Sequence, residues 1–250
     1  MRMQLVRHAT LLVEYGGKRL LVDPMFSPAG ALPATPNTPN QRPNPLVDLP
    51  MDPRSLLDID AIVVTHTHRD HLDDAAVAAL PKHLPLFSQP EDEEKLRGFG
   101  FTRVQPVSTE AAWEGIVFHR TGGQHGTGEI GKAMGPVSGL VLQAEGEPTL
   151  YIAGDTVWCD EMEEALAAHQ PDIVVVNAGG ARFLTGGPIT MTAEDIVQTC
   201  RKAPQARVVA VHMEAWNHCL LTRRELAEAL AAAQLTHQVH IPADGEWLSF

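Results

Sequence analysis

The sequence predicts an α/β fold in which helices cover β-sheets. Short apolar strands are frequent in the first half of the chain, and strands alternate with helices in the second half. Residues 173–176 (IVVV) and 207–211 (RVVAV) are largely continuous apolar runs, which is typical of strands buried on both faces. No change in composition divides the 250 residues, so we expect a single domain over residues 1–250.

The N-terminal part is predicted to form strands followed by a long irregular loop. Residues 3–6, 10–15 and 18–24 are short apolar stretches, and Gly16-Gly17 between the last two indicates a hairpin. The proline density of residues 24–53 excludes regular structure. A loop of this length inside a domain is often a lid or a binding loop.

Strands and helices are then predicted along the rest of the chain. Pro81 ends the first helix, and Gly115 marks a turn between two strands. Thr192 is the expected N-cap of a later helix, with Asp195 reaching back to it. The predicted strands are at 60–65, 84–89, 101–107, 109–120 (two), 137–145, 148–154, 172–180, 206–211 and 238–250 (a last pair), the predicted helices are at 72–80, 90–100, 159–170, 192–203 and 222–234, and a glycine-rich loop is predicted at 121–136.

Composition argues against several classes of partner. The formal net charge is −12, and such an acidic chain repels nucleic acid and anionic membranes. No segment approaches the roughly 18 apolar residues that cross a bilayer, and charged residues interrupt the N-terminus where a signal peptide would be apolar. We therefore expect a cytoplasmic protein in which Cys159, Cys200 and Cys219 are buried, reduced thiols.

Polar residues of the kinds that bind metals or substrates follow several predicted strands. They are Asp23, His66, Asp155, Asn177 and His212. In layered α/β folds, ligands bind beyond the carboxyl ends of the strands. Metal-ligand residue types that recur at strand ends therefore predict a site at that edge of the sheets.

The segment VVTHTHRDHLD, residues 63–73, is the densest group of potential ligands. Residues two apart in an extended chain face the same side, so His66 and His68 can reach one ion. Asp70 and His71 continue the turn and are better placed to serve a second ion beside the first. The segment can begin two adjacent sites but cannot complete both, so distant residues must contribute.

Three later residues are candidates for the missing ligands. His125 lies in the glycine-rich loop, Asp155 follows a strand and could bridge two cations, and His212 also ends a strand. Each has an alternative interpretation. His125 could bond only to the backbone, Asp155 could cap the next helix, as could Asp70, and His218 competes with His212.

Other residues are candidates for contacts around the metals. His218 could contact the substrate or orient a ligand. His8 and Asp23 could orient ligands or make structural hydrogen bonds. Asn177 could contact the substrate or serve a turn. Asp73 is expected to favour the N-terminus of the following helix and to touch no metal.

The motif THTHRDH, residues 65–71, matches the HxHxDH signature of the metallo-β-lactamase superfamily, and His125, Asp155 and His212 follow in that family's order. The opening RHATLLVEYGGKRLLVDP resembles the branch that includes the L-ascorbate-6-phosphate lactonase-like hydrolases. The resemblance implies a four-layer αββα sandwich of two mixed β-sheets with a binuclear metal site at one edge. It implies that one ion is held by His66, His68 and His125, that the other is held by Asp70, His71 and His212, and that Asp155 bridges them.

These features predict a metal-dependent hydrolase acting on a small molecule. Nitrogen-rich ligands with a few carboxylates suit two Zn²⁺ ions, and the resemblance leaves Mn²⁺ or Fe as alternatives. We expect the two ions to share a water, and the resulting hydroxide to cleave an ester, a lactone or a phosphodiester. Asp70 is the expected catalytic residue, orienting the hydroxide and helping to shuttle the proton.

Two other classes of function stay open. One is a di-iron redox or oxygen-handling protein on the same fold, although His68 stands where such relatives carry Glu. The other is a non-catalytic metal-binding module, although every ligand position is filled. A homo-oligomer is compatible with the sequence.

Overall fold

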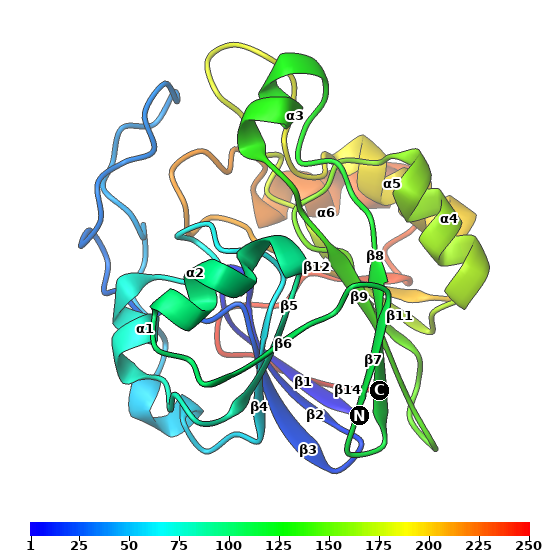
Figure 1. Cartoon of the computed structure of the whole chain (residues 1–250). Coiled ribbons are helices and arrows are strands. Elements are labelled where there is room, and N and C mark those ends of the chain that lie inside the picture. The colour runs from blue at the N-terminus through cyan, green and yellow to red at the C-terminus, as the bar shows by residue number, and fades with distance from the viewer.

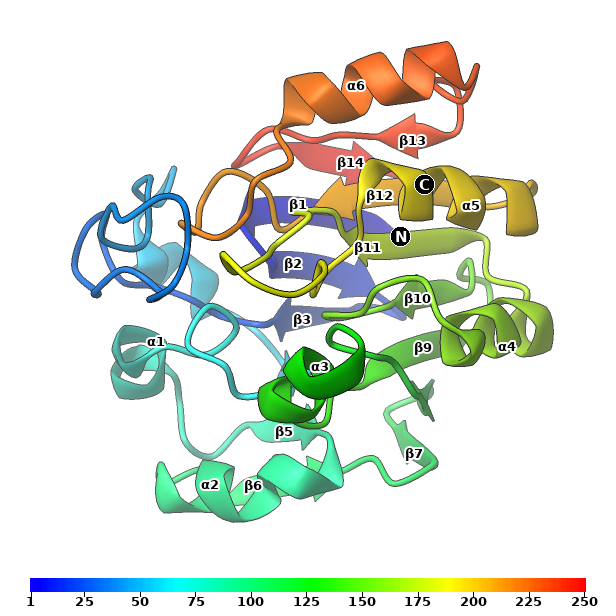
Figure 2. The same cartoon turned by 90° about the horizontal axis from the view of Figure 1, so that it is seen from above.

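Two β-sheets packed face to face form the centre of the molecule, and helices cover their outer faces, as Figure 1 and Figure 2 show. The computed structural model describes residues 1–250. Each sheet has seven strands, and each mixes parallel with antiparallel neighbours. The four-layer αββα sandwich of two mixed sheets is therefore confirmed.

The first sheet is built mainly from the N-terminal half of the chain. In sheet order its strands are β14 (Trp247–Ser249), β1 (Arg2–Arg7), β2 (Thr10–Tyr15), β3 (Lys18–Val22), β4 (Ala61–Val64), β5 (Pro85–Ser88) and β6 (Arg103–Pro106). The predicted hairpin joins β2 to β3, and Gly16 and Gly17 supply the positive φ angles of its turn. From β3 to β6 the strands run parallel, so their carboxyl ends share one edge.

The second sheet contains most of the later strands. In sheet order these are β13 (Val239–His240), β12 (Arg207–Val211), β11 (Ile173–Asn177), β10 (Leu150–Ile152), β9 (Gly139–Ala144), β8 (Ile116–Thr121) and β7 (Glu110–Trp113). The strands β7 to β10 are antiparallel, and β10 to β13 are parallel. The carboxyl ends of β10, β11 and β12 therefore lie together.

Helices form the two outer layers. The first sheet is covered by α1 (Asp74–Ala79), α2 (Glu93–Gly98) and the short 3-10 helix Pro53–Leu56, and a second 3-10 helix, Pro90–Asp92, precedes α2. The second sheet is covered by α4 (Asp160–His169), α5 (Ala193–Lys202) and α6 (Arg223–Ala232). The remaining helix, α3 (Gly128–Met134), stands at the top of the molecule in Figure 1, away from both layers.

An apolar core fills the space between the sheets. It contains 22 buried residues contributed mainly by the strands of both sheets. Phe87 of β5 and Phe118 of β8 stack across this interface with ring centroids 4.2 Å apart. Full burial of one such side chain contributes roughly 1.5–3 kcal/mol. The core therefore holds the two sheets, and the residues at their shared edge, in a fixed relation.

Two helix starts agree with the sequence prediction. Thr192 caps α5, and Asp195 reaches back to complete a capping box. Asp73 caps α1, because its carboxylate accepts a hydrogen bond from the N–H of Ala76. The predicted place of Asp73 at the N-terminus of this helix is confirmed.

Two other expectations about elements are wrong. Residues 121–136, predicted as a loop, include α3, where the small Gly131 lets the first turn close against Gly126. The last two strands do not pair with each other, since β13 pairs with β12 and β14 pairs with β1. The connecting segment crosses from one sheet to the other, and the N–H of Gly245 donates to the carbonyl of Leu5.

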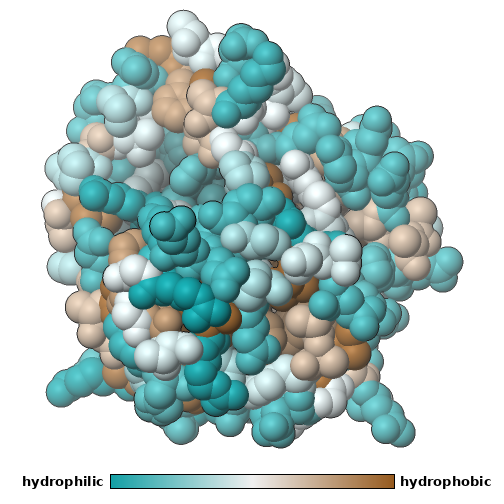
Figure 3. Space-filling view, viewed as in Figure 1, coloured by the Kyte–Doolittle hydropathy of each residue, from teal (hydrophilic) through white to brown (hydrophobic).

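The surface is mainly hydrophilic in the view of Figure 3. Three large apolar side chains are exposed, namely Val47, Leu184 and Leu220. Val47 belongs to the long loop of residues 24–53, which we call the proline loop. None of the helices has the length and apolar character that a bilayer crossing requires.

Candidate metal centre

The predicted ligands meet at the edge where the two sheets come together. His66 lies shortly after β4, Asp155 shortly after β10, and His212 directly after β12. The N–H of His212 donates to the carbonyl of His8, 2.8 Å away, which joins the end of β12 to the end of β1. Strand ends from both sheets thus surround one buried cluster of side chains.

One part of this cluster consists of three imidazoles, His66, His68 and His125, which we call the three-histidine group. His66 Nε2 lies 3.0 Å from His68 Nδ1, and the three potential ligand atoms are all within 4.8 Å of one another. Two nitrogens on one Zn²⁺ ion are about 3.3 Å apart. A small rearrangement of the three side chains would therefore bring these atoms onto a single ion.

The other part consists of Asp70, His71, Asp155 and His212, which we call the carboxylate group. His71 Nε2 lies 3.2 Å from Asp155 Oδ2. His212 Nε2 lies 3.3 Å from Asp70 Oδ2 and 3.4 Å from Asp155 Oδ1. All four residues are buried, so few water molecules can screen their charges.

Asp155, a member of the carboxylate group, also lies close to the three-histidine group. Its Oδ2 lies 3.4 Å from His125 Nε2 and 3.8 Å from His66 Nε2, in addition to its contacts with the carboxylate group. The Nδ2 of Asn177 donates to Asp155 Oδ1 over 2.6 Å and thereby fixes the carboxylate. Asn177, for which a substrate contact or a turn role was predicted, therefore acts on Asp155.

The ring nitrogen on the far side of most of these histidines has its own partner. His71 Nδ1 lies 2.7 Å from Asp23 Oδ2, and His125 Nδ1 lies 2.7 Å from the carbonyl of Ile189. Such partners fix the tautomer and orientation of a histidine that binds a metal. The backbone bond of His125, predicted as an alternative to a ligand role, therefore coexists with its place in the cluster.

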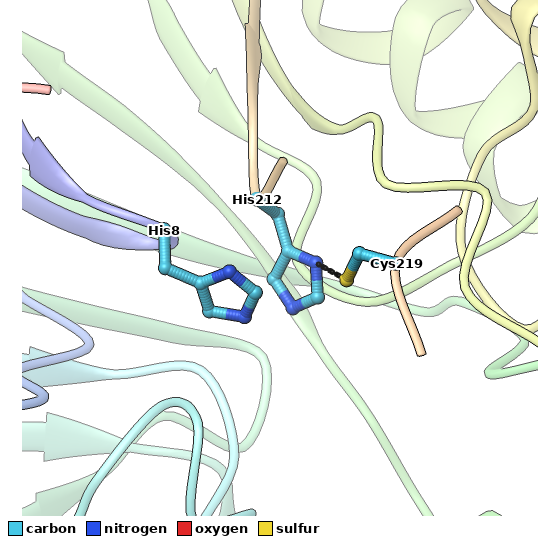
Figure 4. Close-up of side chains that lie close together, drawn as sticks. All are labelled: His8, His212 and Cys219. Atoms are coloured by element: carbon cyan, nitrogen blue, oxygen red, sulfur yellow. Dashed lines mark hydrogen bonds between the residues drawn. The ribbon is translucent and has the colours of Figure 1, made fainter. Parts of the chain in front are cut away.

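His66 and His212 have weaker outer partners. Thr65 Oγ1 lies 3.2 Å from His66 Nδ1, and Cys219 Sγ lies 3.5 Å from His212 Nδ1. Figure 4 shows Cys219 on one side of the His212 ring and His8 on the other. Cys219 was predicted to be an ordinary buried thiol, and it instead is half-buried and contacts a predicted ligand.

His8 lies against the carboxylate group from the end of β1. Its ring centroid is 3.6 Å from that of His212, and its Nε2 is 3.3 Å from Asp70 Oδ2. His8, Asp23 and His212 all have positive φ angles, of 62°, 45° and 64°. Such backbone conformations are uncommon outside glycine and cluster at functional sites.

Two alternative interpretations of the acidic residues are wrong. Asp70 does not cap a helix, because α1 begins later and is capped by Asp73. Asp155 does not cap α4, whose N-cap residue is Cys159 and has no side-chain cap. His218, the competitor of His212, lies outside both groups and beside Phe183.

The charges in the cluster shift the pKa values of several groups. Burial opposes ionisation of Asp155, but His212, His71 and His125 outweigh it and hold the pKa of this carboxyl well below its usual range. Burial also disfavours the charged form of His71, but Asp155 and Asp23 raise its pKa to about 10. Burial and the neighbouring His212 lower the pKa of His8 to about 3, so His8 is neutral.

The donor atoms fit divalent metal ions. His71 Nε2, His125 Nε2 and His212 Nε2 are buried and make no hydrogen bond. Each buried polar atom without a partner costs about 1–3 kcal/mol. All three atoms point into the groups described above, where a cation would satisfy them, and imidazole with carboxylate is a donor set that suits Zn²⁺.

A pocket of about 280 Å³ opens onto the cluster. Its walls come from the proline loop, from α3 and from the loop at 182–190, and a hollow is visible in the upper part of Figure 3. A larger hollow, of about 370 Å³ beside Arg182, contains none of the predicted ligands. The lining residues of the first pocket are Pro33, Ala34, Thr35, Pro36, His68, Arg69, Asp70, His125, Met134, Phe183, Trp216 and His218.

Sequence reasoning missed several residues that shape this site. Met134, Phe183 and Trp216 line the pocket, and Cys219 contacts His212. The sequence favoured neither a ligand-orienting nor a structural role for Asp23, although its position at the end of a strand indicated that it lies near the site. No local pattern marks the others, because loops far apart in the sequence bring them together.

Comparisons with known proteins agree with this geometry. A family model described as the beta-lactamase superfamily domain matches residues 18–213. The UPF0173 protein YddR of Bacillus subtilis (strain 168) is 41% identical over 249 residues, covering 98% of each chain. The UPF0173 metal-dependent hydrolase Atu1317 of Agrobacterium fabrum (strain C58 / ATCC 33970) is 25% identical over 259 residues, covering 100% of each chain.

Solved structures superpose over the whole chain. An isothiocyanate hydrolase from Delia radicum gut bacteria has a TM-score of 0.95 and 39% identity, covering 100% of this chain and 99% of that one. A possible metal-dependent hydrolase from Veillonella parvula DSM 2008 has a TM-score of 0.97 and 33% identity, with the same coverage. The chain therefore belongs to the metallo-β-lactamase superfamily, within the UPF0173 family of metal-dependent hydrolases.

Proposed function

We propose that the protein uses a binuclear metal site to hydrolyse a small, uncharged electrophile, with an isothiocyanate as the preferred substrate class. The observation that carries this proposal is the joining of two groups of buried ligand atoms by Asp155, beside a pocket with mainly uncharged walls. The protein would hold one ion with the three-histidine group and the other with the carboxylate group. Zn²⁺ is the preferred metal, and Mn²⁺ or Fe is the alternative.

Two divalent ions, when bound, supply a water of lowered pKa and polarise the substrate. Asp70 belongs to the carboxylate group and also lines the pocket, so it faces both a ligand position and the substrate. Burial opposes ionisation of Asp70, but the neighbouring imidazoles of His212 and His8 outweigh it and hold the pKa of this carboxyl well below its usual range. Asp70 is therefore an ionised carboxylate that can orient the attacking water and accept its proton.

His8 keeps Asp70 in place for this role. Its neutral ring can donate from Nε2 to Asp70 Oδ2, and its face packs on His212. His218 lines the same pocket as Asp70, which supports a contact between His218 and the substrate.

The lining of the pocket favours a neutral apolar substituent. Two prolines, Met134, Phe183 and Trp216 form much of it, and Arg69 is its one lysine or arginine. The similarity to an isothiocyanate hydrolase, at 39% identity over the full chain, supports the same substrate class here. Water would add to the central carbon of R–N=C=S to give a thiocarbamic acid, which divides into the amine and carbonyl sulfide.

A lactone is a second candidate, favoured by the resemblance of residues 7–24 to the L-ascorbate-6-phosphate lactonase-like branch. The pocket supplies one arginine for a phosphate, which is a weak match for a doubly charged group. Simple esters and phosphodiesters are further candidates, and the substrate panel described below includes them. In each case the partner is a small molecule, and we propose a cytoplasmic location for the reaction.

The experiment is a substrate panel on purified protein loaded with Zn²⁺ or Mn²⁺. Release of amine from methyl, allyl and benzyl isothiocyanate is measured beside hydrolysis of lactones, esters and phosphodiesters. Asp70→Asn should lower turnover by about 10²–10⁴-fold, as expected for loss of a general base. Asp74→Asn, an exposed neighbour on α1, should leave turnover unchanged.

Metal analysis accompanies the panel. Loaded protein that turns over none of these substrates would contradict a hydrolytic role. Iron with a visible absorption band would favour the redox alternative on the same fold.

A further inference from the structure

One wall of the pocket is formed by a stretch of the proline loop. Residues 33–36 (PATP), which we call the pocket wall, line the pocket beside Trp216 and His218. Prolines have no N–H, so this stretch cannot be held by a regular β-ladder. The proline loop contains one isolated bridge, between Leu32 and Asn44. Other contacts must therefore fix the wall.

The side chain of Asn217 supplies those contacts. Its Oδ1 accepts hydrogen bonds from the N–H of Thr35 at 3.0 Å and from Nδ2 of Asn44 at 2.8 Å. Its Nδ2 donates toward the carbonyl of Thr35 at 3.0 Å, Oγ1 of Thr38 at 2.8 Å and the carbonyl of Asn40 at 2.6 Å. Asn217 is fully buried, so the whole amide is directed at the proline loop.

The backbone around Asn217 adds to the same connection. The N–H of Asn217 donates to Asn44 Oδ1 at 2.8 Å, and the carbonyl of Ala215 accepts from the N–H of Leu46 at 2.8 Å. Trp216 donates from Nε1 to Thr35 Oγ1 at 2.9 Å. Residues 35–46 of the proline loop are thus joined to the segment that follows β12.

That segment also reaches the metal centre. It begins at His212 and includes Trp216 and His218, which line the pocket on either side of Asn217. Asn217 itself does not line the pocket and belongs to neither ligand group. Its position couples the pocket wall to the strand end that carries His212.

We propose that Asn217 is a positioning residue that sets the size of substituent the enzyme accepts, by holding the pocket wall at a fixed distance from the metal centre. The inference rests on the proposed function, whose substrate selectivity it explains. A wall that is ordered before binding spares the substrate the entropy cost of ordering it. Loosening the wall should therefore weaken binding of substrates whose substituent reaches it, while the chemistry at the metal centre continues.

A buried amide elsewhere in the chain provides a matched control. Gln238 donates from Nε2 to the carbonyls of Cys200, Ala203 and Ala206, at 3.2, 2.9 and 3.0 Å. It holds the connection before β12, at the opposite end of the strand from His212. Gln238→Ala should therefore cost stability in the same manner as Asn217→Ala without reaching the pocket.

The experiment compares metal-loaded wild type with Asn217→Ala, Thr38→Val and Gln238→Ala. Steady-state KM and kcat are measured for methyl and benzyl isothiocyanate, together with metal content and hydrogen exchange over residues 32–46. We expect Asn217→Ala to raise KM for the benzyl substrate by about 10-fold relative to the methyl one, a span typical of apolar pocket contacts. Metal content should be unchanged, kcat should change little, and exchange over residues 32–46 should be faster.

The other variants should follow the same logic. Thr38→Val removes one partner of Asn217 and should shift the KM ratio in the same direction by a smaller factor. It decides the question if Asn217→Ala does not fold. Gln238→Ala should lower Tm without changing the KM ratio. An equal change of KM for both substrates, or an unchanged ratio despite faster exchange, would overturn the proposal.

A binding measurement separates this inference from the proposed function. If the wild type hydrolyses neither isothiocyanate, the proposed substrate class fails, and calorimetric binding of N-benzylthiourea and N-methylthiourea replaces KM. Loss of the preference between these two molecules in Asn217→Ala would then still support the role of the wall. Retention of the wild-type preference would refute it.

Discussion

The three-histidine group and the carboxylate group lie side by side and differ in charge. The first offers three imidazoles and no carboxylate, while the second offers two carboxylates with two imidazoles. Their outer partners differ as well, because His71 is held by the carboxylate of Asp23, whereas His66 is held by a hydroxyl and His125 by a backbone carbonyl. Negative charge is therefore concentrated on one side of a shared centre.

This asymmetry has a consequence for metal binding. A cation gains more from buried carboxylates than from neutral rings, since the low local dielectric strengthens charge interactions. The carboxylate group should accordingly bind its ion more tightly. The three-histidine group contains no carboxylate, so an ion held there gains negative charge from Asp155 alone. The Oδ2 of Asp155 lies 3.4 Å from His125 Nε2.

The largest effect should follow from removing the charge that both groups share. Asp155→Asn keeps the shape of the side chain but removes its negative charge, and we expect the loss of both ions. Metal assistance is worth several kcal/mol, so activity should fall by about 10³-fold or more. Elemental analysis and turnover measure the result. Full metal content in this variant would contradict a bridging role for Asp155.

A smaller effect should separate the two groups. His66→Ala and His212→Ala should each reduce about two bound equivalents to about one, with the remaining ion in the other group. A weak chelator should remove the ion of the three-histidine group first. If the wild type releases both ions together, and the remaining ion is bound equally tightly in both variants, the two groups do not differ as their charges imply.

Much of this site was predictable because the strand ends carry the signal. His66, Asp155 and His212 each stand where a buried apolar strand stops, and the order of ligands matches a known signature. The apolar strands predicted an α/β fold, and the sandwich of two mixed sheets was implied by that resemblance. The partition of the ligands into two groups also agrees with the distances between their atoms.

The features that escaped prediction depend on the tertiary fold. The positive φ angles of His8 and His212 have no local sequence signal, and they arise where the ends of β1 and β12 are hydrogen-bonded together. Asn217 reaches the proline loop from more than 170 residues away along the chain. Residues 121–136 were predicted to form a loop because they are rich in glycine. These glycines instead permit the close approach of the backbone on which α3 depends.

The next prediction concerns the outer partner of the carboxylate group. Asp23→Asn removes the carboxylate that faces His71 Nδ1, while its remaining oxygen can still accept from the N–H of Thr65. Loss of such a partner typically costs about 10–100-fold in metal affinity or activity. Competition with a fluorescent chelator measures the affinity. Unchanged affinity would mean that Asp23 serves the fold rather than His71.

The smallest effect is expected at Cys219, where the outer partner is a thiol. Sulfur is a weak hydrogen-bond partner, and Cys219 Sγ lies 3.5 Å from His212 Nδ1. A hydrogen bond at the weak end of the usual range contributes about 0.5 kcal/mol, so Cys219→Ala should lower the metal affinity of this group by about 2-fold. His212 keeps its orientation because its N–H is bonded to the carbonyl of His8 and its ring is stacked on that of His8.

The loss of metal affinity in Asp23→Asn, compared with the loss in Cys219→Ala, then tests which outer partner orients the histidines of the carboxylate group. If the carboxylate of Asp23 dominates, the first variant should lose much more affinity than the second in the same chelator competition. A loss at Cys219 as large as that at Asp23 would mean that the orientation of His212 depends on the thiol. In that case the packing of His8 against His212 would not suffice to hold the ligand, and the two histidines of this group would be equally dependent on their outer partners.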